Sequence, residues 1–286
     1  MMVAFSSSSL YAATIPLRVL TYNVWGLPVP AEHAPWRYAE IAKRLAAYDV
    51  VAFEETWSTK TDVIWKLPSH PYHVFGGQAH GLIGGSGLIV ISKFPILESH
   101  FEKYHDCDGF ECTAGKGALM FRVQLKPGLE VDVYATHTNA WQDQSLVRSG
   151  QLMQLVGMVE QYSIGRPIIV MGDFNSEFHS TNYDELQGNL MLRDSYDEYI
   201  RGLSNPTQEQ TDGFSYDIVK NPWAAPALSH EDHRQRLDYI FYRDTYELRI
   251  GVRSSALAFT EAVQSDKPLS DHYAVTTLFD LTTRTD

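Results

Sequence analysis

Short runs of β-branched and aromatic residues recur along the whole chain and predict strands. They lie at residues 17–22, 50–53, 87–91, 119–123, 131–135, 168–171, 237–242 and 274–279. Several runs, such as 168–171, are apolar at nearly every position, which is typical of strands buried on both faces. Others alternate, as at Leu119, Phe121 and Val123, which favours a strand with one buried face.

Apolar residues three or four positions apart predict helices between some of these strands. The apolar positions are Tyr38, Ile41 and Leu45 in one helix and Leu152, Leu155, Val156 and Val159 in another, which we expect from about residue 144 to 162. Strands that alternate irregularly with few helices predict an α/β fold of two packed sheets flanked by helices. Residues 204–236 are polar and broken by prolines and glycine, so we expect a long surface excursion there.

The composition is that of a globular protein with a sizeable core. Of the 286 residues, 44% are hydrophobic and 20% are charged, which argues against disorder. We expect one domain over residues 14–286. The net charge of −12 argues against a generic nucleic-acid binder, but a metal-dependent phosphoesterase remains open because bound cations supply positive charge. No apolar run approaches the roughly 18 residues of a spanning helix.

Two local features bear on the compartment. Residues 1–13 are small and apolar, and they are either the remnant of a secretory signal or a disordered N-terminus. The two cysteines, Cys107 and Cys112, suit a local disulfide of an exported protein, although two free thiols remain the alternative. A zinc site is disfavoured because the spacing is not that of a paired-cysteine motif. We therefore expect a secreted or periplasmic protein.

Polar residues follow or begin the predicted strands at six places. They are Asn23, the pair Glu54 and Glu55, His137, Asp173 with Asn175, Asp238, and Asp271 with His272. Each alone is typical of a turn, a strand cap or a helix start. Together they indicate a functional rim, because strand ends converge there and the loops carry function. Several carboxylates without nearby thiols suit a hard cation such as Mg²⁺.

The same motifs resemble the exonuclease–endonuclease–phosphatase superfamily, which includes DNase-like nucleases and inositol phosphatases. The resemblance rests on Asn23, Glu55, THT around His137, GDFN at 172–175, LDY at 237–239 and SDH at 270–272. It covers residues 20–279. Within the superfamily, YNVWGLP, GSGLIVISKFPI, AGKGALMFRVQL and ATHTNAW resemble the neutral sphingomyelinase group. FEETW departs from the usual Gln-Glu pair, so we place the metal ligand at Glu55 rather than Glu54.

The resemblance implies a four-layer α/β/β/α sandwich of two packed mixed sheets flanked by helices. It also implies hydrolysis of sphingomyelin to ceramide and phosphocholine with Mg²⁺, or with Mn²⁺ in its place. The implied metal-binding residues are Asn23, Glu55 and Asp271. The implied catalytic residues are His137, Asp173, Asn175, Asp238 and His272.

We assign an expected role to each of the catalytic residues. His272 is the expected general base for the attacking water, because its ordinary pKa lies near neutrality. Asp238 is expected to accept a hydrogen bond from its other ring nitrogen. Asp173 and Asn175 are expected to position the water and a phosphoryl oxygen, and His137 to donate to the phosphoryl oxygens.

The expected partner is a membrane lipid at a bilayer surface, with no nucleic acid, and no protein partner is legible. Residues 222–228 and 81–85 are candidate apolar contacts with the bilayer, with loops packed on the core as the alternative. Two other functions stay open. One is a nuclease or inositol-phosphate phosphatase of the same superfamily, and the other is a non-catalytic binding module.

Overall fold

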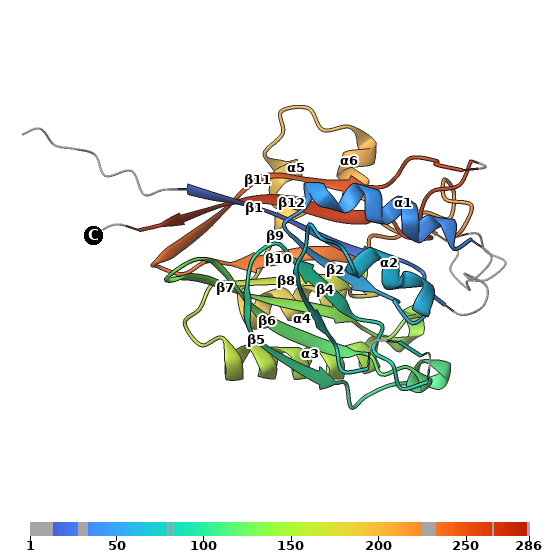
Figure 1. The fold of residues 1–286 in the computed structure, drawn as a ribbon, viewed down its shortest axis with the longest axis horizontal. Coiled ribbons are helices and arrows are strands. Elements are labelled where there is room, and N and C mark those ends of the chain that lie inside the picture. The colour runs from blue at the N-terminus through green and yellow to red at the C-terminus, as the bar shows by residue number, and fades with distance from the viewer. Residues whose placement is uncertain are drawn as a thin grey trace, which may run out of the picture.

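Two six-stranded sheets form the centre of the structure, a computed structural model that describes residues 14–27, 34–78, 80–81, 83–224, 233–264 and 266–284 (Figure 1). The first sheet has the order β11-β12-β1-β2-β4-β3, with β1 (Thr14–Asn23), β2 (Val50–Glu54), β3 (Tyr72–Phe75), β4 (Ile89–Ser92), β11 (Leu248–Ala258) and β12 (Ala274–Thr283). The second has the order β5-β6-β7-β8-β10-β9, with β5 (Ile96–Lys103), β6 (Gly117–Lys126), β7 (Leu129–His137), β8 (Ile168–Asp173), β9 (Arg193–Asp194) and β10 (Asp238–Arg243).

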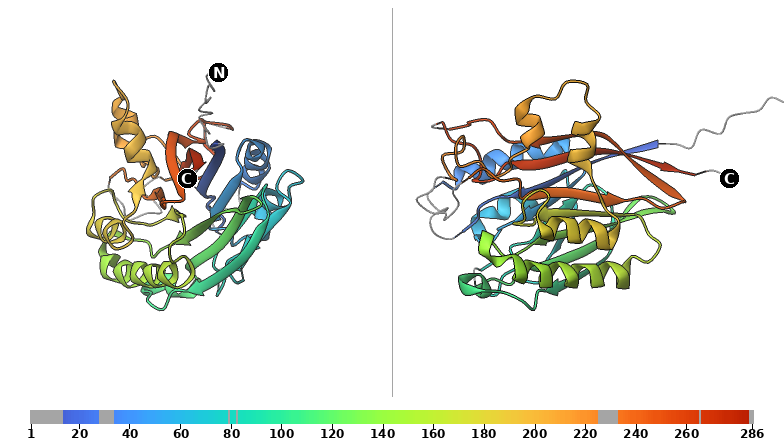
Figure 2. Two further views of the ribbon diagram at one scale, coloured as in Figure 1. Left: turned by 90° about the vertical axis from the view of Figure 1, so that its left-hand side faces the viewer. Right: turned by 180° about the vertical axis from the view of Figure 1, so that it is seen from behind.

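Both sheets are mixed, because each contains one parallel pair among antiparallel ones. The parallel pairs are β1 with β2 and β7 with β8. The helices are α1 (Trp36–Arg44), α2 (Asp62–Trp65), α3 (Ser145–Tyr162), α4 (Thr181–Leu190), α5 (Ser195–Arg201) and α6 (Gln208–Asp212). Figure 2 shows α1 outside one sheet and α3 outside the other.

Alternating side chains build the layers. In β1, Leu17 and Val19 pack between the sheets, whereas Leu20 and Tyr22 pack against α1. The same period of two in β6 sends Phe121 to the space between the sheets. Helix α3 covers the outer face of the second sheet with a buried apolar stripe. The four-layer α/β/β/α sandwich expected from the sequence is therefore confirmed.

The eight predicted strands are all present, and four further strands complete the sheets. The additional strands are β3, β5, β9 and β11, which are the two edges of each sheet. The helix expected near 144–162 is α3, and the structure joins Cys107 to Cys112 in a disulfide. The excursion at 204–236 contains α6, and Tyr216 then pairs with Gln235 and His272 in isolated bridges. The excursion thus returns to the rim that carries the polar motifs.

Three sequence expectations fall partly or wholly outside the described residues. These are the leader or disordered segment at 1–13, the apolar stretch 225–228 and Leu82. Among the described residues, no helix is long and apolar enough to cross a membrane.

Candidate active site

The strand directions bring the predicted residues to one rim. In the first sheet, parallel β1 and β2 end side by side at Asn23 and Glu54, and antiparallel β12 begins just after His272. In the second sheet, β7 and β8 end at His137 and Asp173, and antiparallel β10 begins opposite Asp173 at Asp238. Residues up to 249 positions apart in the chain therefore meet at one end of the sandwich.

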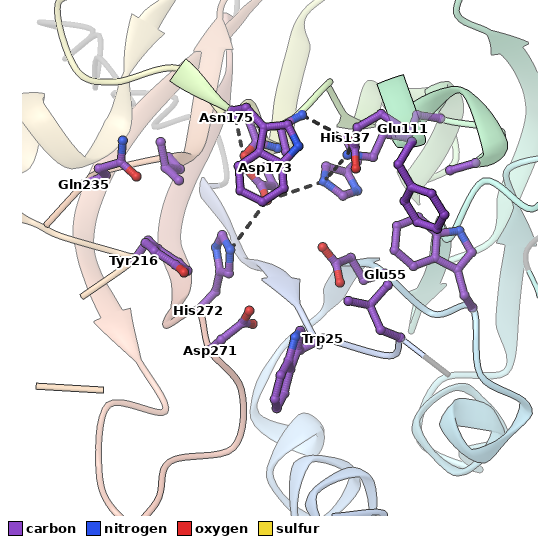
Figure 3. A pocket seen from close by; sticks show the side chains of 18 of the residues that line it. Trp25, Glu55, Glu111, His137, Asp173, Asn175, Tyr216, Gln235, Asp271 and His272 are labelled. Carbon is purple, nitrogen blue, oxygen red and sulfur yellow. Dashed lines mark hydrogen bonds and ion pairs between the residues drawn. The ribbon is translucent and has the colours of Figure 1, made fainter. Parts of the chain in front are cut away.

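A cavity of about 280 Å³ opens at this rim (Figure 3). Six of the eight predicted residues line it, namely Glu55, His137, Asp173, Asn175, Asp271 and His272. Asn23 and Asp238 lie behind this wall and contact it through hydrogen bonds. Aromatic side chains supply much of the remaining lining: Trp25, Trp57, Phe110, Trp141, Tyr216 and Trp223.

The backbone around the cavity is strained. Glu55, Asn175, Trp25 and Trp141 all have positive φ, between 44° and 76°, a region that non-glycine residues seldom adopt. All four line the cavity. Strain of this kind persists where the surrounding structure holds a side chain in place, and it is concentrated at functional sites. For Glu55, this turn sends the carboxylate into the cavity.

Glu54 and Glu55 have different surroundings. The Glu54 carboxylate is fully buried and accepts a hydrogen bond from Thr21 Oγ1 over 2.8 Å. It does not line the cavity, whereas Glu55 does. Burial raises the pKa of Glu54 well above its ordinary value, and the charge of Asp238 adds to this. The structure thus brings Glu55, and not Glu54, to the cavity wall.

Glu55, Asn23 and Asp271 form a group with unsatisfied negative charge. Asn23 Nδ2 donates to Glu55 Oε1 over 3.1 Å and to Asp173 Oδ2 over 3.0 Å. Glu55 Oε2 is buried and has no hydrogen-bond partner within the described ranges. Burial and the charge of Asp271 raise the pKa of Glu55 to about 8. The two carboxyl groups fit a hard divalent cation, which would neutralise them. Asn23 presents its Nδ2 to them, and its Oδ1 accepts from Trp25 N over 3.0 Å.

A second group of candidate ligands lies nearby. Single ligand atoms of Asp173, Asp238 and His272 all fall within 4.8 Å of one another. In this group, His272 Nδ1 lies only 2.8 Å from Asp238 Oδ2, and Asp238 does not face the cavity. These two side chains are therefore hydrogen-bonded to each other. Asp238 Oδ1 and Glu55 Oε2 both lack a partner among the described residues, but only Glu55 lines the cavity, so it is the better match to a cation that binds there.

His272 is held by acidic side chains. Its Nδ1 contacts Asp238, and its Nε2 lies 3.8 Å from Asp173 Oδ2. Burial opposes the charged ring, but Asp238 and Asp173 outweigh it and hold the pKa of His272 well above its ordinary value. The contact with Asp238 fixes a proton on Nδ1 and leaves Nε2 facing the cavity side of the ring.

His137 has the opposite partner. Lys116 Nζ lies 3.0 Å from His137 Nε2 and also donates to the Thr138 carbonyl over 2.9 Å. Burial, followed by the charge of Lys116, holds the pKa of His137 well below its ordinary value. Asp173 Oδ2 lies 3.6 Å from the same Nε2. A charged Lys116 donates to Nε2, so the neutral ring carries its proton on Nδ1.

Lys116 and its partner Glu111 are site residues that the motifs did not reveal. The two form an ion pair in which Lys116 is buried and Glu111 is partly exposed, and both line the cavity. Lys116 lowers the pKa of Glu111 below its ordinary value, against the effect of burial. Glu111 lies in the short 3₁₀ helix Gly109–Thr113, directly before disulfide-bonded Cys112. The sequence offered one hint of Lys116, because it is a single cation that lies between two glycines directly before an apolar strand run.

A family model matches residues 20–272, most of the chain, and is described as the endonuclease/exonuclease/phosphatase family. The chain belongs to this family, whose name covers enzymes that cleave phosphoester bonds. The sphingomyelinase of Mycobacterium tuberculosis is 28% identical over 269 residues, covering 89% of this chain and 50% of the relative. The inositol phosphosphingolipids phospholipase C of Schizosaccharomyces pombe is 25% identical over 297 residues, covering 93% of this chain and 68% of the relative. The chain thus spans about half the length of the mycobacterial relatives it matches.

Solved structures share the fold. Sphingomyelinase C from Streptomyces griseocarneus has a TM-score of 0.65 at 20% identity, over 93% of this chain and 99% of that one. Danio rerio TDP2 complexed with single-strand DNA product has a TM-score of 0.73 at 18% identity, over 92% and 98%. A Staphylococcus aureus beta toxin mutant with bound magnesium ions has a TM-score of 0.64 at 19% identity, over 94% and 100%. Together with the named relatives, these confirm the resemblance to the neutral sphingomyelinase group.

Proposed function

We propose that this chain is a divalent-cation-dependent phosphodiesterase that hydrolyses sphingomyelin to ceramide and phosphocholine. The observation that carries the proposal is one cavity in which the Glu55 carboxylate faces two buried histidines with opposite partners. Relatives named as sphingomyelinases support the lipid substrate. The family match supports the phosphoester chemistry.

His272 activates the water. In its neutral form, Nε2 accepts the proton as the water oxygen attacks phosphorus. Asp238 holds the other ring proton on Nδ1, over 2.8 Å, and stabilises the imidazolium that forms. Asp173 Oδ2 lies 3.8 Å from Nε2, so a water on the cavity side of both atoms is oriented by the two together.

Lys116, His137 and Asn175 face the phosphoryl oxygens. Negative charge develops on these oxygens in the transition state, and fixed donors in a buried site stabilise it strongly. Lys116 is a buried cation on the cavity wall whose charge stabilises these oxygens. Its three N–H groups already bind Glu111, His137 and Thr138, so it donates to the substrate only by releasing one of them. The Asn175 amide nitrogen has two hydrogens; one binds the Thr138 carbonyl over 3.1 Å, which leaves one for the substrate. Because His137 Nε2 accepts from Lys116, donation from this atom requires that Lys116 move away and that the ring proton shift from Nδ1 to Nε2.

Glu55, Asn23 and Asp271 are the proposed cation ligands, with Mg²⁺ as the preferred ion and Mn²⁺ as the alternative. A bound divalent cation at this site supplies positive charge for the departing ceramide oxygen and offsets the surrounding carboxylates. Asn23 links the group to Asp173 through a 3.0 Å hydrogen bond, so the cation ligands and the water-positioning side chain are held together.

Contact with a bilayer is proposed for the aromatic mouth of the cavity. Trp223, half-buried, packs on Trp25 with 5.3 Å between ring centroids, and Phe110 is exposed. Aromatic groups bind at zwitterionic lipid surfaces without requiring a basic protein, which suits a net charge of −12. The disulfide favours an oxidising compartment. We therefore propose a secreted or periplasmic protein that binds membranes peripherally.

The test is an assay of purified protein on sphingomyelin, phosphatidylcholine, phosphoinositides and duplex DNA, with Mg²⁺ and with EDTA. We expect cation-dependent release of phosphocholine from sphingomyelin. Undiminished hydrolysis in EDTA would contradict the metal assignment, and cleavage of DNA alone would replace the lipid assignment with a nuclease. Glu55→Gln and Glu54→Gln form a matched pair, in which only the first should abolish turnover.

A further inference from the structure

Arg37 is a buried cation that the proposed mechanism does not use. It lies in the first turn of α1, and its side chain is among the largest that have no exposed surface. Burying a charge is costly unless its polar groups are paired. The hydrogen bonds of Arg37 go to carbonyl and hydroxyl oxygens of the catalytic rim rather than to a carboxylate.

Four of the five N–H groups of Arg37 have partners in or beside the rim loops. Nη1 donates to the carbonyls of Val24 over 3.1 Å and Leu269 over 2.7 Å. Nη2 donates to the Trp25 carbonyl over 3.0 Å and to Tyr38 Oη over 3.3 Å. Nε has no partner among the described residues. The planar guanidinium therefore joins the loop after β1 to the loop before β12.

These two loops carry proposed cation ligands. Asn23 ends β1 directly before the two carbonyls that Arg37 binds in the first loop, and Asp271 lies two positions after the third carbonyl. Trp25 N donates to Asn23 Oδ1 over 3.0 Å, and Asn23 Nδ2 donates to Glu55 Oε1 over 3.1 Å. Figure 3 shows Trp25, Glu55 and Asp271 at one side of the cavity. A chain of contacts thus leads from Arg37 to the ligand group.

Trp25 is the strained member of this chain. Its φ is 48°, which is unfavourable for a residue with a side chain and persists only where neighbours hold it. Arg37 binds the Trp25 carbonyl, and its guanidinium carbon lies 5.1 Å from the centroid of the Trp25 ring and 5.9 Å from that of Trp223. One side chain therefore supports both the backbone and the ring of Trp25.

Ser270 provides a second link between the two loops. It is fully buried, and its hydroxyl lies 2.7 Å from the Asn23 carbonyl and 3.1 Å from Asp271 Oδ1. A hydroxyl has one hydrogen, so Ser270 donates to one of these oxygens at a time. The two loops are therefore held together at two separate points.

The charge of Arg37, taken alone, acts against a cation at this site. Burial raises the pKa of Asp271, and the charges of His272 and Arg37 act against this, so the Arg37 charge reaches the ligand group. A buried positive charge repels a second one. Removing Arg37 should therefore strengthen cation binding if only its charge matters, and weaken it if Arg37 holds the ligands in place.

We propose that Arg37 is a positioning residue that prearranges Asn23, Glu55 and Asp271 for a divalent cation. This rests on the proposed function, because it takes these three residues as the cation ligands. Side chains that orient metal ligands typically change metal affinity by about 10-fold to 100-fold when they are removed. Arg37 therefore sets the cation affinity of the site without lining the cavity itself.

The experiment measures the Kd of Mn²⁺ by electron paramagnetic resonance on purified, metal-free protein without lipid, well below the Tm of each variant. Arg37→Met removes the guanidinium and its charge, whereas Arg37→Lys keeps the charge and loses the planar fork. We expect both to raise Kd by about tenfold or more, and Glu55→Gln to abolish binding at this site. At saturating Mn²⁺, kcat on sphingomyelin should approach the wild-type value in both Arg37 variants, because the ligands remain.

Arg122→Met is the matched control. Arg122 is ion-paired with Asp132, six residues along the chain from Lys116 and away from the rim. Its loss should lower Tm and leave Kd unchanged, which separates positioning from general destabilisation. Ser270→Ala keeps Arg37 and removes the second link, so it should raise Kd by a smaller factor even if the Arg37 variants do not fold.

The outcomes distinguish this inference from the proposed function. An unchanged Kd in folded Arg37 variants, or in Ser270→Ala when the Arg37 variants do not fold, would overturn the positioning role alone. Tighter binding in Arg37→Met with a normal Kd in Arg37→Lys would replace it with a purely electrostatic role. A wild type without a Mn²⁺ site that Glu55→Gln abolishes would overturn the cation assignment of the proposed function, and this inference with it.

Discussion

The two histidines of the cavity are both buried, but they differ in the charge of their partner and in the direction in which their pKa is shifted. His137 is 1% exposed and His272 is 6% exposed. His272 contacts the Asp238 carboxylate, and its pKa is raised despite burial; His137 contacts the Lys116 ammonium, and burial and Lys116 lower its pKa. Environments that separate the pKa values of two like groups assign them different roles. One half of the cavity is therefore built to hold a proton, and the other to remain neutral beside a fixed cation.

The two halves also differ in how the fold supports them. His272 precedes β12 in the first sheet, whereas Asp238 begins β10 in the second, so this pair joins the two sheets. His137 and Lys116 lie at the ends of paired strands β7 and β6 in a single sheet. Asp173 lies between the halves, 3.6 Å from His137 Nε2 and 3.8 Å from His272 Nε2. The contact between His272 and Asp238 therefore depends on how the two sheets pack on each other. The contact between His137 and Lys116 depends only on the pairing of β6 with β7.

The largest loss of activity should come from removing the proposed cation site, on which both the His272 half and the His137 half of the cavity depend. Glu55→Ala, or chelation of the wild type, should lower kcat by more than about 10³, because neither histidine can replace the charge supplied by a cation. The fold should survive, since Glu55 lies on the cavity wall. The assay is release of phosphocholine from sphingomyelin together with a melting curve. A normal rate in Glu55→Ala and loss in Glu54→Ala would shift the ligand by one residue.

The next effect should break the His272 half alone. Asp238→Asn can turn its NH₂ toward His272 Nδ1 and favour the tautomer that protonates Nε2. The analogous change in serine proteases costs about 10⁴ in kcat. We expect about 10² to 10³ here, because a divalent cation held by Glu55 would share the activation of water. Turnover and Tm measured on the same variant separate the roles, since near-normal kcat with a lowered Tm would leave Asp238 as a structural residue.

Much of this arrangement was predictable because the interior strands carry strong signals. All eight predicted strands lie inside the sheets, and the four missed strands, β3, β5, β9 and β11, are the edges. An edge strand has one neighbour and faces solvent, so charged and polar residues are favoured there. The sequence of β5, ILESHFEK, shows this, because none of its residues is fully buried and at least half of them are charged or polar residues such as Glu98, Ser99 and Lys103. Runs of apolar residues therefore predict the interior strands of a sheet but not its edge strands.

The candidate site also has parts that the sequence predicted and parts that it did not. The His272 half was legible because LDY and SDH place both partners beside strand runs. In the His137 half, the sequence predicted His137 but not Lys116. Lys116 reaches His137 Nε2 only because β6 pairs with β7, and that pairing cannot be read from the local sequence. The adjoining cavity of about 400 Å³, lined by Ser145, Asn182 and Gln235 among others, could not be predicted from the sequence. Its wall combines the starts of two helices with the segment before β10, and nothing in local spacing predicts that meeting.

A smaller effect should mark the His137 half. Lys116→Met keeps the length of the apolar stem and removes the charge. We expect kcat to fall by about 10 to 10², less than the roughly 10² to 10³ for loss of a dedicated transition-state donor, because the N–H groups of Lys116 are already bound to protein acceptors. Lys116→Arg should recover part of the rate because the charge returns. A loss in Lys116→Met as large as that in Asp238→Asn would contradict the division of roles, and would make Lys116 the principal stabiliser of the phosphoryl charge.

The smallest effect concerns the disulfide, which supports only the His137 half. Cys112 follows Glu111, the partner of Lys116, so the Cys107–Cys112 bridge helps to hold that carboxylate against the ammonium. A loop this short should stabilise the fold by about 2 kcal/mol on the chain-entropy model, which corresponds to a fall in Tm of about 4 °C in the double variant Cys107→Ser and Cys112→Ser. We expect kcat to fall no more than about threefold, because the ion pair remains possible without the bridge. The decisive comparison repeats the double variant in a Lys116→Met background. If the bridge acts through Glu111 and Lys116, its effect on kcat should disappear there while its effect on Tm persists. An undiminished effect on kcat in that background would show that the bridge shapes the cavity by another route, and a Tm that does not change in either background would remove its structural role as well.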